Sequence, residues 1–385
     1  MLSKYVLFKV QSTIAILFIS VASQASIIPS PPELAASAYL LMDANSGKII
    51  VSHNANEKIP PASLTKMMTS YIVESELKSG RIALSDETKI SEKAWGWGGS
   101  KMFLQVNSLV SIEDLLRGLI IQSGNDAAIA LAEHVAGTEK IFANVMNQYA
   151  EKLGMHNTNF VNASGWPADN HYSTAGDLAL LARSIVTDHS EFYPIYSERE
   201  FTFNNITQSN RNSLLWRSPN VDGLKTGHTE EAGYCLVSSA LQDGMRLIAV
   251  VTGTRNESAR EQESLKLLSY GFRYYETHML YQKADTLNVS RVWAGAIENV
   301  ELGLLEDALV TIPRGDEDKL KARLEINPVI EAPVRTGDVL GTLTVVLEDQ
   351  TVIERSLVAL SDIPQAGFFS RILDYISLFF FNLFN

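Results

Sequence analysis

The chain of 385 residues contains little cysteine and less positive than negative charge. Its one cysteine, Cys235, cannot form a disulfide bond within the chain, so an apolar core must supply the stability. Lysine and arginine number 32 against 44 aspartates and glutamates, which argues against nucleic acid as a partner because phosphates require a basic surface. The histidines form no His-Glu-x-x-His or other clustered ligand pattern. We therefore expect no metal and no other cofactor.

The first 25 residues have the pattern of an export signal. Lys4 and Lys9 precede or flank the apolar run STIAILFISVA, and the small residues SQA end at Ala25. We interpret residues 1–25 as a cleaved signal peptide, which places the mature chain outside the cytoplasm. The alternative is a retained N-terminal anchor, although the apolar run is short for a membrane span.

Residues 26–284 show the pattern of a single domain that mixes helices and strands, of the α/β (α+β) class. In order, the chain has a strand pair at 36–53, a mainly helical stretch at 62–187, a hairpin that turns at Asp243-Gly244, and a charged helix at about 257–277. Ser111 with Asp114, and Thr174 with Asp177, have the spacing of capping boxes. We expect a helical cluster packed against an antiparallel sheet.

Residues 285–362 predict a separate, small all-β domain. Short apolar runs such as DALVTIP and VLGTLTVVL alternate there with turn sequences such as RGDED and EDQ.

The tail, residues 363–385, predicts an amphipathic helix. Its apolar face comprises Phe369, Ile372, Leu373, Ile376, Phe380, Leu383 and Phe384. Arg371 and Asp374 lie opposite, and Leu378 intrudes on that polar side. The segment is too short and too charged for a span, so we expect it to bind the membrane surface without crossing. The alternative is a final helix packed on the protein's own core.

The stretch PPASLTKMMTSYIV, residues 60–73, places Ser63 and Lys66 three residues apart at the start of an expected helix. A serine hydroxyl becomes a nucleophile when a neighbouring base takes its proton, and a lysine serves as that base only when it is neutral. Burial or a second cation lowers a lysine pKa enough for this role. The same pattern also fits an ordinary helix cap followed by a solvated lysine. Motifs elsewhere in the chain are therefore needed to distinguish a catalytic pair from a helix cap.

Two further stretches complete a known set of motifs. QSGND contains Ser123-Gly124-Asn125, and VDGLKTGHTEEAGY contains Lys225-Thr226-Gly227. Ser-x-x-Lys, Ser-x-Asn and Lys-Thr-Gly in this order are typical of β-lactamases and penicillin-binding proteins.

The residue types of these motifs suit acyl transfer. Lys225 supplies a second cation, and Ser123 can relay a proton between Lys66 and a leaving nitrogen. The amide of Asn125 suits contact with a peptide backbone. We expect Gly227 to let a strand edge approach a substrate that pairs like an added strand.

With these motifs in place, the chain resembles the low-molecular-mass penicillin-binding proteins that are serine-type D-alanyl-D-alanine carboxypeptidases. Segments such as LGMHNTNFVNASG and HYSTAGDLALLAR look like those of that family, and the resemblance runs from about Ser37 to the C-terminus. It implies a β-lactamase/transpeptidase-like domain, a small β domain and an amphipathic tail at the periplasmic face of the cytoplasmic membrane. It also implies peptidoglycan pentapeptide as substrate and β-lactams as covalent inhibitors.

The resemblance assigns further roles. It implies that the acyl-enzyme forms on Ser63 and that the N–H groups of Ser63 and His228 build the oxyanion hole. His228 thus has a backbone role and is not a member of a Ser-His triad. Thr226 and an arginine, which by its position is Arg260, are implied to hold the terminal carboxylate of the substrate. The alternative for Arg260 is a solvated helix residue.

Three other functions remain as alternatives. A class A β-lactamase normally has Ser-Asp-Asn where this chain has Ser-Gly-Asn, and that function leaves the small β domain unexplained. A D,D-endopeptidase is closer, but the relatives associated with that activity lack the β domain. A non-catalytic wall-binding module is expected to lose Ser63 or Lys66, and both are present.

Overall fold

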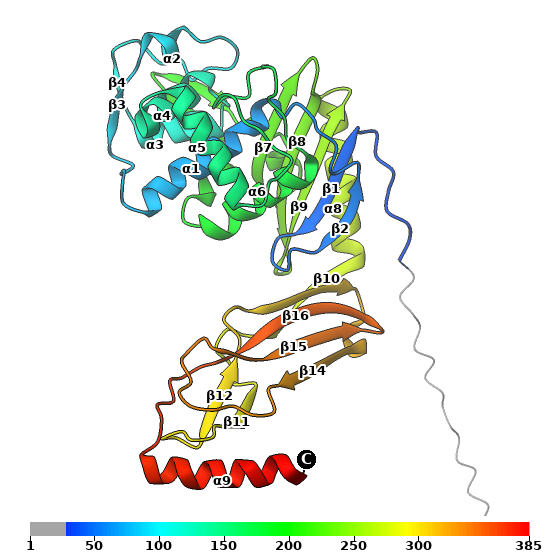
Figure 1. The fold of residues 1–385 in the computed structure, drawn as a ribbon. Coiled ribbons are helices and arrows are strands. Elements are labelled where there is room, and N and C mark those ends of the chain that lie inside the picture. Colours follow the sequence, from blue (N-terminus) through cyan, green and yellow to red (C-terminus); the bar gives the residue numbers. More distant parts are fainter. Residues whose placement is uncertain (1–27, 385) are drawn as a thin grey trace, which may run out of the picture.

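The structure, a computed structural model, describes residues 28–384, so the expected signal peptide at 1–25 lies outside the described residues. A five-stranded sheet in the order β2-β1-β9-β8-β7 forms the middle of the N-terminal domain, with every neighbouring pair antiparallel (Figure 1). Its strands are β1 (Ala38–Asp43), β2 (Ile49–His53), β7 (Val221–Thr229), β8 (Gly233–Gln242) and β9 (Met245–Thr254).

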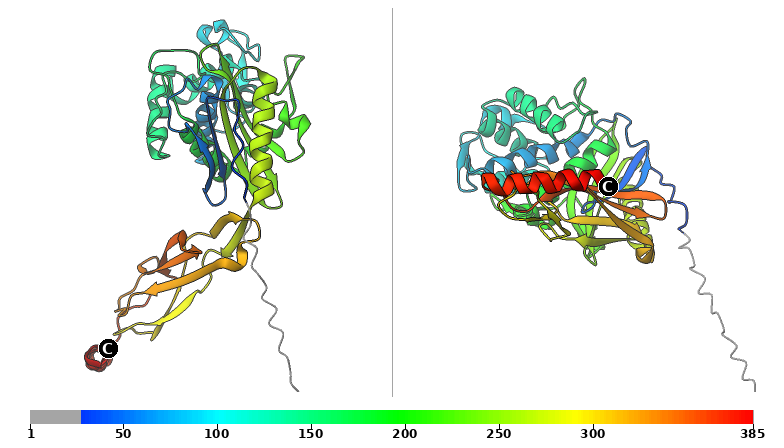
Figure 2. Two further views of the ribbon diagram at one scale, coloured as in Figure 1. Left: turned by 90° about the vertical axis from the view of Figure 1, so that its right-hand side faces the viewer. Right: turned by 60° about the horizontal axis from the view of Figure 1, so that its bottom comes forward.

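Helices cover both faces of this sheet (Figure 2). One face carries α1 (Lys66–Lys78), α3 (Ile112–Ile120), α4 (Asn125–Ala136), α5 (Glu139–Lys152) and α6 (Ala175–Asp188), and the other carries α8 (Glu257–Tyr274). Side chains along β1 alternate between the two cores: Leu40 packs with the helical cluster, whereas Leu41 packs with Leu267 of α8. The expected helical cluster against an antiparallel sheet is confirmed.

Short elements fill the remainder of this domain. They are η1 (Ala62–Thr65), β3 (Glu87–Lys89), α2 (Glu92–Gly96), β4 (Leu109–Ser111), η2 (Tyr193–Ser197), β5 (Glu200–Phe203), β6 (Ile206–Ser209) and α7 (Leu214–Arg217).

Local sequence signals predicted several of these boundaries correctly. The Ser111 hydroxyl accepts a hydrogen bond from the backbone N–H of Asp114 at 3.1 Å and caps α3. The β8–β9 hairpin turns at Asp243 and Gly244, whose φ angles of 50° and 81° suit a two-residue turn. The helix expected to extend to about 277 is wrong at its end, because α8 stops at Tyr274 and the following residues pair as a strand.

The C-terminal part is all-β, as predicted. Its five-stranded sheet has the order β11-β12-β16-β15-β14, and β10 pairs with β13. The strands are β10 (Tyr275–Tyr281), β11 (Asn288–Arg291), β12 (Asn299–Gly303), β13 (Ala308–Pro313), β14 (Leu320–Ile326), β15 (Val339–Leu347) and β16 (Gln350–Ala359), with η3 (Glu317–Lys319) before β14. A separate apolar core, which includes Leu302, Val310 and Leu343, stabilises this domain.

The tail forms α9 (Phe368–Phe384), which lies across the end of the β domain that is farthest from the helical cluster (Figures 1 and 2). The Asp374 carboxylate accepts hydrogen bonds from the Ala294 N–H at 2.9 Å and from Arg291 Nη2 at 3.2 Å. Leu378, which intrudes on the polar side, is 7% exposed because that side packs on the β domain, whereas Phe369 on the apolar face is 82% exposed. No helix among residues 28–384 is both long and apolar enough to cross a membrane.

Candidate active site

Ser63 lies at the point where the chain enters α1. Pro61 precedes Ala62, whose φ of 48° turns the backbone into the single 3-10 turn η1. This turn places Ser63 beside Lys66, so that Lys66 Nζ donates a hydrogen bond to Ser63 Oγ at 3.0 Å. Lys66 is 1% exposed, which excludes the alternative of a solvated lysine.

The environment of Lys66 favours its neutral form. Burial lowers the pKa of Lys66 to about 7, and the negative charge of Asp126 acts in the opposite direction. Lys66 Nζ also donates to the backbone carbonyl of Ser164 at 2.5 Å. A buried amine with a pKa close to neutrality, in contact with a hydroxyl, is the arrangement that general-base activation of serine requires.

The sequence does not predict that the Ser164 carbonyl contacts Lys66, although the residues of the turn that presents this carbonyl are typical of a tight turn. The Asn162 side chain accepts hydrogen bonds from the N–H groups of Gly165 at 2.8 Å and Trp166 at 3.1 Å, as expected of asparagine in a tight turn. Gly165 has a φ of 81°, and a Cβ there would lie 1.7 Å from the Ala62 carbonyl oxygen. Only glycine therefore lets this loop pack against η1.

The second motif lies between α3 and α4. Ser123 has a φ of 65°, and its buried hydroxyl has no hydrogen-bond partner among the described residues. The Asn125 side chain donates from Nδ2 to the Gly98 carbonyl at 2.8 Å, which fixes the orientation of its amide. Ser123 and Ser63 line the same cavity, so the structure brings the first two motifs together.

Lys225 lies on β7, one of the two edge strands of the sheet, and is 2% exposed. Its ammonium donates to the Thr226 carbonyl at 3.1 Å. Burial lowers the pKa of Lys225 well below its ordinary value, and the positive charges of Lys66, Arg260 and Arg211 act in the same direction. The two buried lysines are thus coupled through charge repulsion.

Packing within the protein requires glycine at position 227, and the approach of a substrate to this strand edge stays a prediction. A Cβ at this position would lie 3.1 Å from Leu64 Cγ and 3.2 Å from the Pro61 carbonyl oxygen. Glycine therefore allows β7 to lie directly against η1. The next residue, His228, is exposed, and its ring lies against that of Tyr234 with the centroids 4.0 Å apart and the planes tilted by 34°.

A cavity of about 240 Å³ reaches Ser63, and its charged lining residues are Arg211, Arg260 and Glu257, the last of which accepts a hydrogen bond from Arg260 Nη2 at 3.5 Å. Thr226, Arg260 and Arg211 line it, together with Ser63 and Ser123. Arg260 is 4% exposed, which excludes the alternative of a solvated helix residue, and its Nε has no hydrogen-bond partner among the described residues. Arg211 was missed in the sequence, because nothing in QSNRNSLLW indicates that its side chain reaches this cavity.

A larger cavity of about 630 Å³ also reaches Ser63. Asn125, Trp166 and His228 contribute to its lining. We refer to the 240 Å³ cavity as the arginine cavity and to this one as the main cavity. Ser63 and His228 line both, so a ligand that contacts Ser63 can extend in two directions.

Comparison with known proteins decides the family. Residues 25–256 match the family model described as D-alanyl-D-alanine carboxypeptidase, and residues 275–365 match that of the penicillin-binding protein 5 C-terminal domain. The chain belongs to the D-alanyl-D-alanine carboxypeptidase family. The first match covers the helix-and-sheet domain as far as the start of α8, and the second covers the all-β domain of this family member.

Individual family members are similar over nearly the whole chain. The D-alanyl-D-alanine carboxypeptidase DacC of Escherichia coli strain K12 is 45% identical, over 96% of this chain and 94% of the relative. DacA of Haemophilus influenzae is 44% identical, over 91% of this chain and 90% of the relative. The crystal structure of penicillin-binding protein 5 from Haemophilus influenzae covers 88% of this chain and 100% of that chain with a TM-score of 0.83 at 44% identity.

Proposed function

We propose that the chain is a serine-type D-alanyl-D-alanine carboxypeptidase. It removes the terminal D-alanine from peptidoglycan pentapeptide stems through an acyl-enzyme on Ser63, and β-lactams acylate the same serine. The observation that carries this proposal is the 3.0 Å contact between the buried Lys66 amine and the Ser63 hydroxyl, beside a cavity lined by Arg260. Membership of the carboxypeptidase family supports the substrate class.

Acylation begins with the substrate carboxylate in the arginine cavity, held by Thr226 and Arg260. Ser63 Oγ attacks the carbonyl carbon of the penultimate D-alanine and passes its proton to neutral Lys66. The N–H groups of Ser63 and His228 hold the oxyanion. Ser123 relays the proton to the leaving nitrogen, the C–N bond breaks, and free D-alanine departs.

In deacylation, a water molecule is the nucleophile and Ser63 Oγ is the leaving group. A water molecule attacks the ester carbon, Lys66 takes a proton from the water, and the proton returns to Ser63 Oγ as the C–O bond breaks. The products are the shortened peptide and the free enzyme.

The substrate itself sets the charge of the two lysines. Its carboxylate, which we place next to Thr226, brings a negative charge near the preceding residue, Lys225, and such a charge raises the pKa of that ammonium. A charged Lys225 then disfavours the charged form of Lys66 by repulsion. Binding therefore leaves Lys66 as the neutral base and Lys225 as the fixed positive charge.

Arg260→Ala should lower kcat/KM for peptide hydrolysis at least tenfold, because removing a charge-assisted hydrogen bond costs roughly 1.5 to 3 kcal/mol. The intact enzyme should hydrolyse peptides with an amidated C-terminus poorly for the same reason. The measurement is D-alanine release, with Arg273→Ala as control, since Arg273 is an exposed arginine farther along α8. Equal turnover of free and amidated peptides would favour a D,D-endopeptidase instead.

Two assays separate the remaining alternatives. A carboxypeptidase releases D-alanine from the pentapeptide faster than it hydrolyses benzylpenicillin, whereas a β-lactamase shows the reverse. A non-catalytic wall-binding module gives neither product. We expect D-alanine release to dominate.

We also propose that the chain is exported and lies at the periplasmic face of the cytoplasmic membrane. The parts expected from the sequence are a signal peptide at 1–25, a catalytic domain at 26–284, a β domain at 285–362 and an anchor at 363–385. Because β10 (Tyr275–Tyr281) pairs with β13, we propose that the β domain begins at residue 275. The exposed apolar face of α9, with Phe369 and Leu373 turned away from the β domain, supports surface binding.

Truncation after Pro364 should yield a protein that is soluble without detergent and still binds penicillin. The full-length mature protein should remain in the membrane pellet at high salt, because apolar burial rather than charge dominates its binding, and should be released by detergent. Sedimentation of the two proteins with membranes measures this. A full-length mature protein that is soluble and monomeric without lipid or detergent would contradict the anchor.

A further inference from the structure

The short segment 171–173, which precedes α6, pairs with two stretches of chain that are far apart in sequence. The N–H and carbonyl groups of Tyr172 form hydrogen bonds with the backbone of Asn159 at 3.1 and 2.9 Å. The N–H and carbonyl groups of Ser173 form hydrogen bonds with the backbone of Ile59 at 2.9 and 2.8 Å. The segment therefore links the chain that leads into η1 with the chain that follows Asn159.

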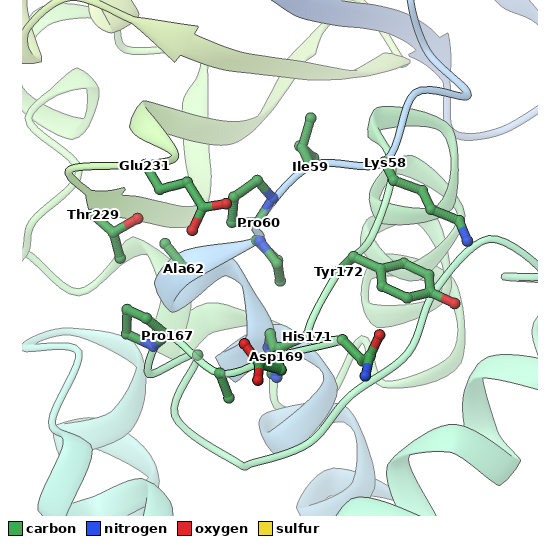
Figure 3. Close-up of a pocket in the computed structure, with 14 residues that line it drawn as sticks. Lys58, Ile59, Pro60, Ala62, Pro167, Asp169, His171, Tyr172, Thr229 and Glu231 are labelled. Atoms are coloured by element: carbon green, nitrogen blue, oxygen red, sulfur yellow. The ribbon is translucent and has the colours of Figure 1, made fainter.

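The side chain of His171 makes a second link between the same two stretches. His171 is 7% exposed, and the close-up in Figure 3 shows it beside the chain that enters α1. Its Nδ1 accepts a hydrogen bond from the Val161 N–H at 3.0 Å, so Nε2 carries the proton and donates to Thr65 Oγ1 at 2.8 Å. Thr65 belongs to η1, and Val161 belongs to residues 160–166, which we call the carbonyl loop.

The two linked stretches are those that surround the Lys66 amine. Lys66 Nζ donates to the hydroxyl of Ser63, in η1, at 3.0 Å and to the carbonyl of Ser164, in the carbonyl loop, at 2.5 Å. The stretches also touch directly, since a Cβ at Gly165 would lie 1.7 Å from the Ala62 carbonyl oxygen. A shift of the carbonyl loop relative to η1 therefore changes the position of the amine relative to the hydroxyl.

The His171 ring is suited to a permanent link and not to proton transfer in the reaction. Burial lowers the pKa of His171 to about 4, so the ring keeps one donor and one acceptor at neutral pH. In the described part of the chain it forms no hydrogen bond with Ser63 or Lys66. Any effect of His171 on the reaction must therefore pass through Thr65 and Val161.

We infer that His171 is a positioning residue for the acylation of Ser63. By joining η1 to the carbonyl loop, it keeps the Ser63 hydroxyl and the Ser164 carbonyl within hydrogen-bond distance of the Lys66 amine. The inference rests on the proposed function, and it gives a role in the reaction to a residue outside the three motifs.

His171→Ala should lower the plateau rate of acylation by benzylpenicillin roughly tenfold to hundredfold, because a displacement of about 1 Å at a reacting group has an effect of this size. The midpoint of the pH profile should also move to lower pH. Loss of the Ser164 carbonyl removes an acceptor that favours the charged amine of Lys66, whereas the charges of Asp126 and Lys225 remain. Stopped-flow measurement of the acylation rate against pH gives both quantities.

Two conservative variants separate the two hydrogen bonds of the ring. His171→Asn keeps an acceptor near the position of Nδ1, and His171→Gln keeps a donor near the position of Nε2. Each variant should preserve one link, so both acylation rates should lie between those of the wild type and His171→Ala. If His171→Ala does not fold, these two variants provide the test, and wild-type rates in both would overturn the inference.

His189→Ala is the matched control for loss of stability. His189 is also buried, at 3% exposed, and its Nε2 forms a hydrogen bond with Ser75 Oγ at 3.0 Å near the C-terminal end of α1. This variant should lower the unfolding temperature, as His171→Ala does, but should be acylated at the wild-type rate.

Three results would overturn the role of His171 alone. They are a folded His171→Ala protein with the wild-type acylation rate, a midpoint that does not move to lower pH, and an equal loss of rate in His189→Ala. A wild-type enzyme that forms no penicillin adduct and releases no D-alanine would overturn the proposed function and the inference with it.

Discussion

Ser63→Ala should abolish covalent labelling by a fluorescent penicillin and lower D-alanine release by several orders of magnitude. The Ser63 hydroxyl oxygen is the atom that forms the acyl bond, and no other hydroxyl among the described residues accepts a hydrogen bond from the Lys66 amine. Fluorescence of the protein band after electrophoresis, together with a D-alanine assay, measures both effects.

The fold of Ser63→Ala should remain intact. The Ser63 side chain does not cap η1, so its removal costs only the hydrogen bond with Lys66, about 1 kcal/mol. Thermal unfolding followed by circular dichroism checks this. Ser79→Ala, at the exposed C-terminal end of α1, is the matched control and should be labelled like the wild type. Labelling of Ser63→Ala at full stoichiometry would remove Ser63 from the mechanism.

Lys66→Arg should be inactive in acylation, whereas Lys225→Arg should retain part of the activity. Arginine keeps its proton at any working pH and cannot serve as the base, but it still supplies the positive charge proposed for Lys225. In the wild type, burial lowers the pKa of Lys66 to about 7. Since only the neutral amine accepts a proton, the acylation rate should rise as the pH increases through about 7 and then level off.

Stopped-flow measurement of the penicillin acylation rate against pH tests the role of Lys66. The variant Lys225→Arg serves as the comparison, because it makes the same change of residue type at the other buried lysine. Near-normal acylation by Lys66→Arg, or a wild-type rate that falls as the pH rises from 6 to 8, would contradict the base assignment.

The sequence predicts those parts of the fold that depend on local chemistry. Capping residues such as Ser111 and the turn at Asp243-Gly244 act within a few residues, so their structural effects follow from the pattern alone. The end of α8 depends instead on a distant strand: residues after Tyr274 pair with β13, and this pairing overrides the helical pattern.

In the candidate site, too, some residues can be predicted from local sequence and others cannot. The motifs identify Ser63 and Lys66, but the Ser164 carbonyl that binds Lys66 comes from a loop 98 residues away in sequence. A backbone carbonyl has no sequence signal of its own. Arg211 reaches the arginine cavity only because of how its loop folds, and Gly227 is required by its contact with η1. These roles depend on tertiary packing.

In the tail, the packing of α9 on the β domain explains why an apolar residue interrupts the polar side of the helix. Leu378 breaks the polar side of the helix in sequence, yet it is buried because that side lies on the β domain. Asp374 adds a specific contact there through the Ala294 N–H. The amphipathic pattern therefore reflects two contacts: packing on the protein on one side and the proposed lipid surface on the other.

The most direct test of the acyl-enzyme is the intact mass of the mature protein before and after reaction with benzylpenicillin. Opening of the β-lactam ring transfers the whole antibiotic, so the account predicts one adduct with the full mass of benzylpenicillin. Proteolysis should locate this adduct on the peptide that contains Ser63. An unmodified mass, or an adduct at Cys235 or another residue, would contradict the account.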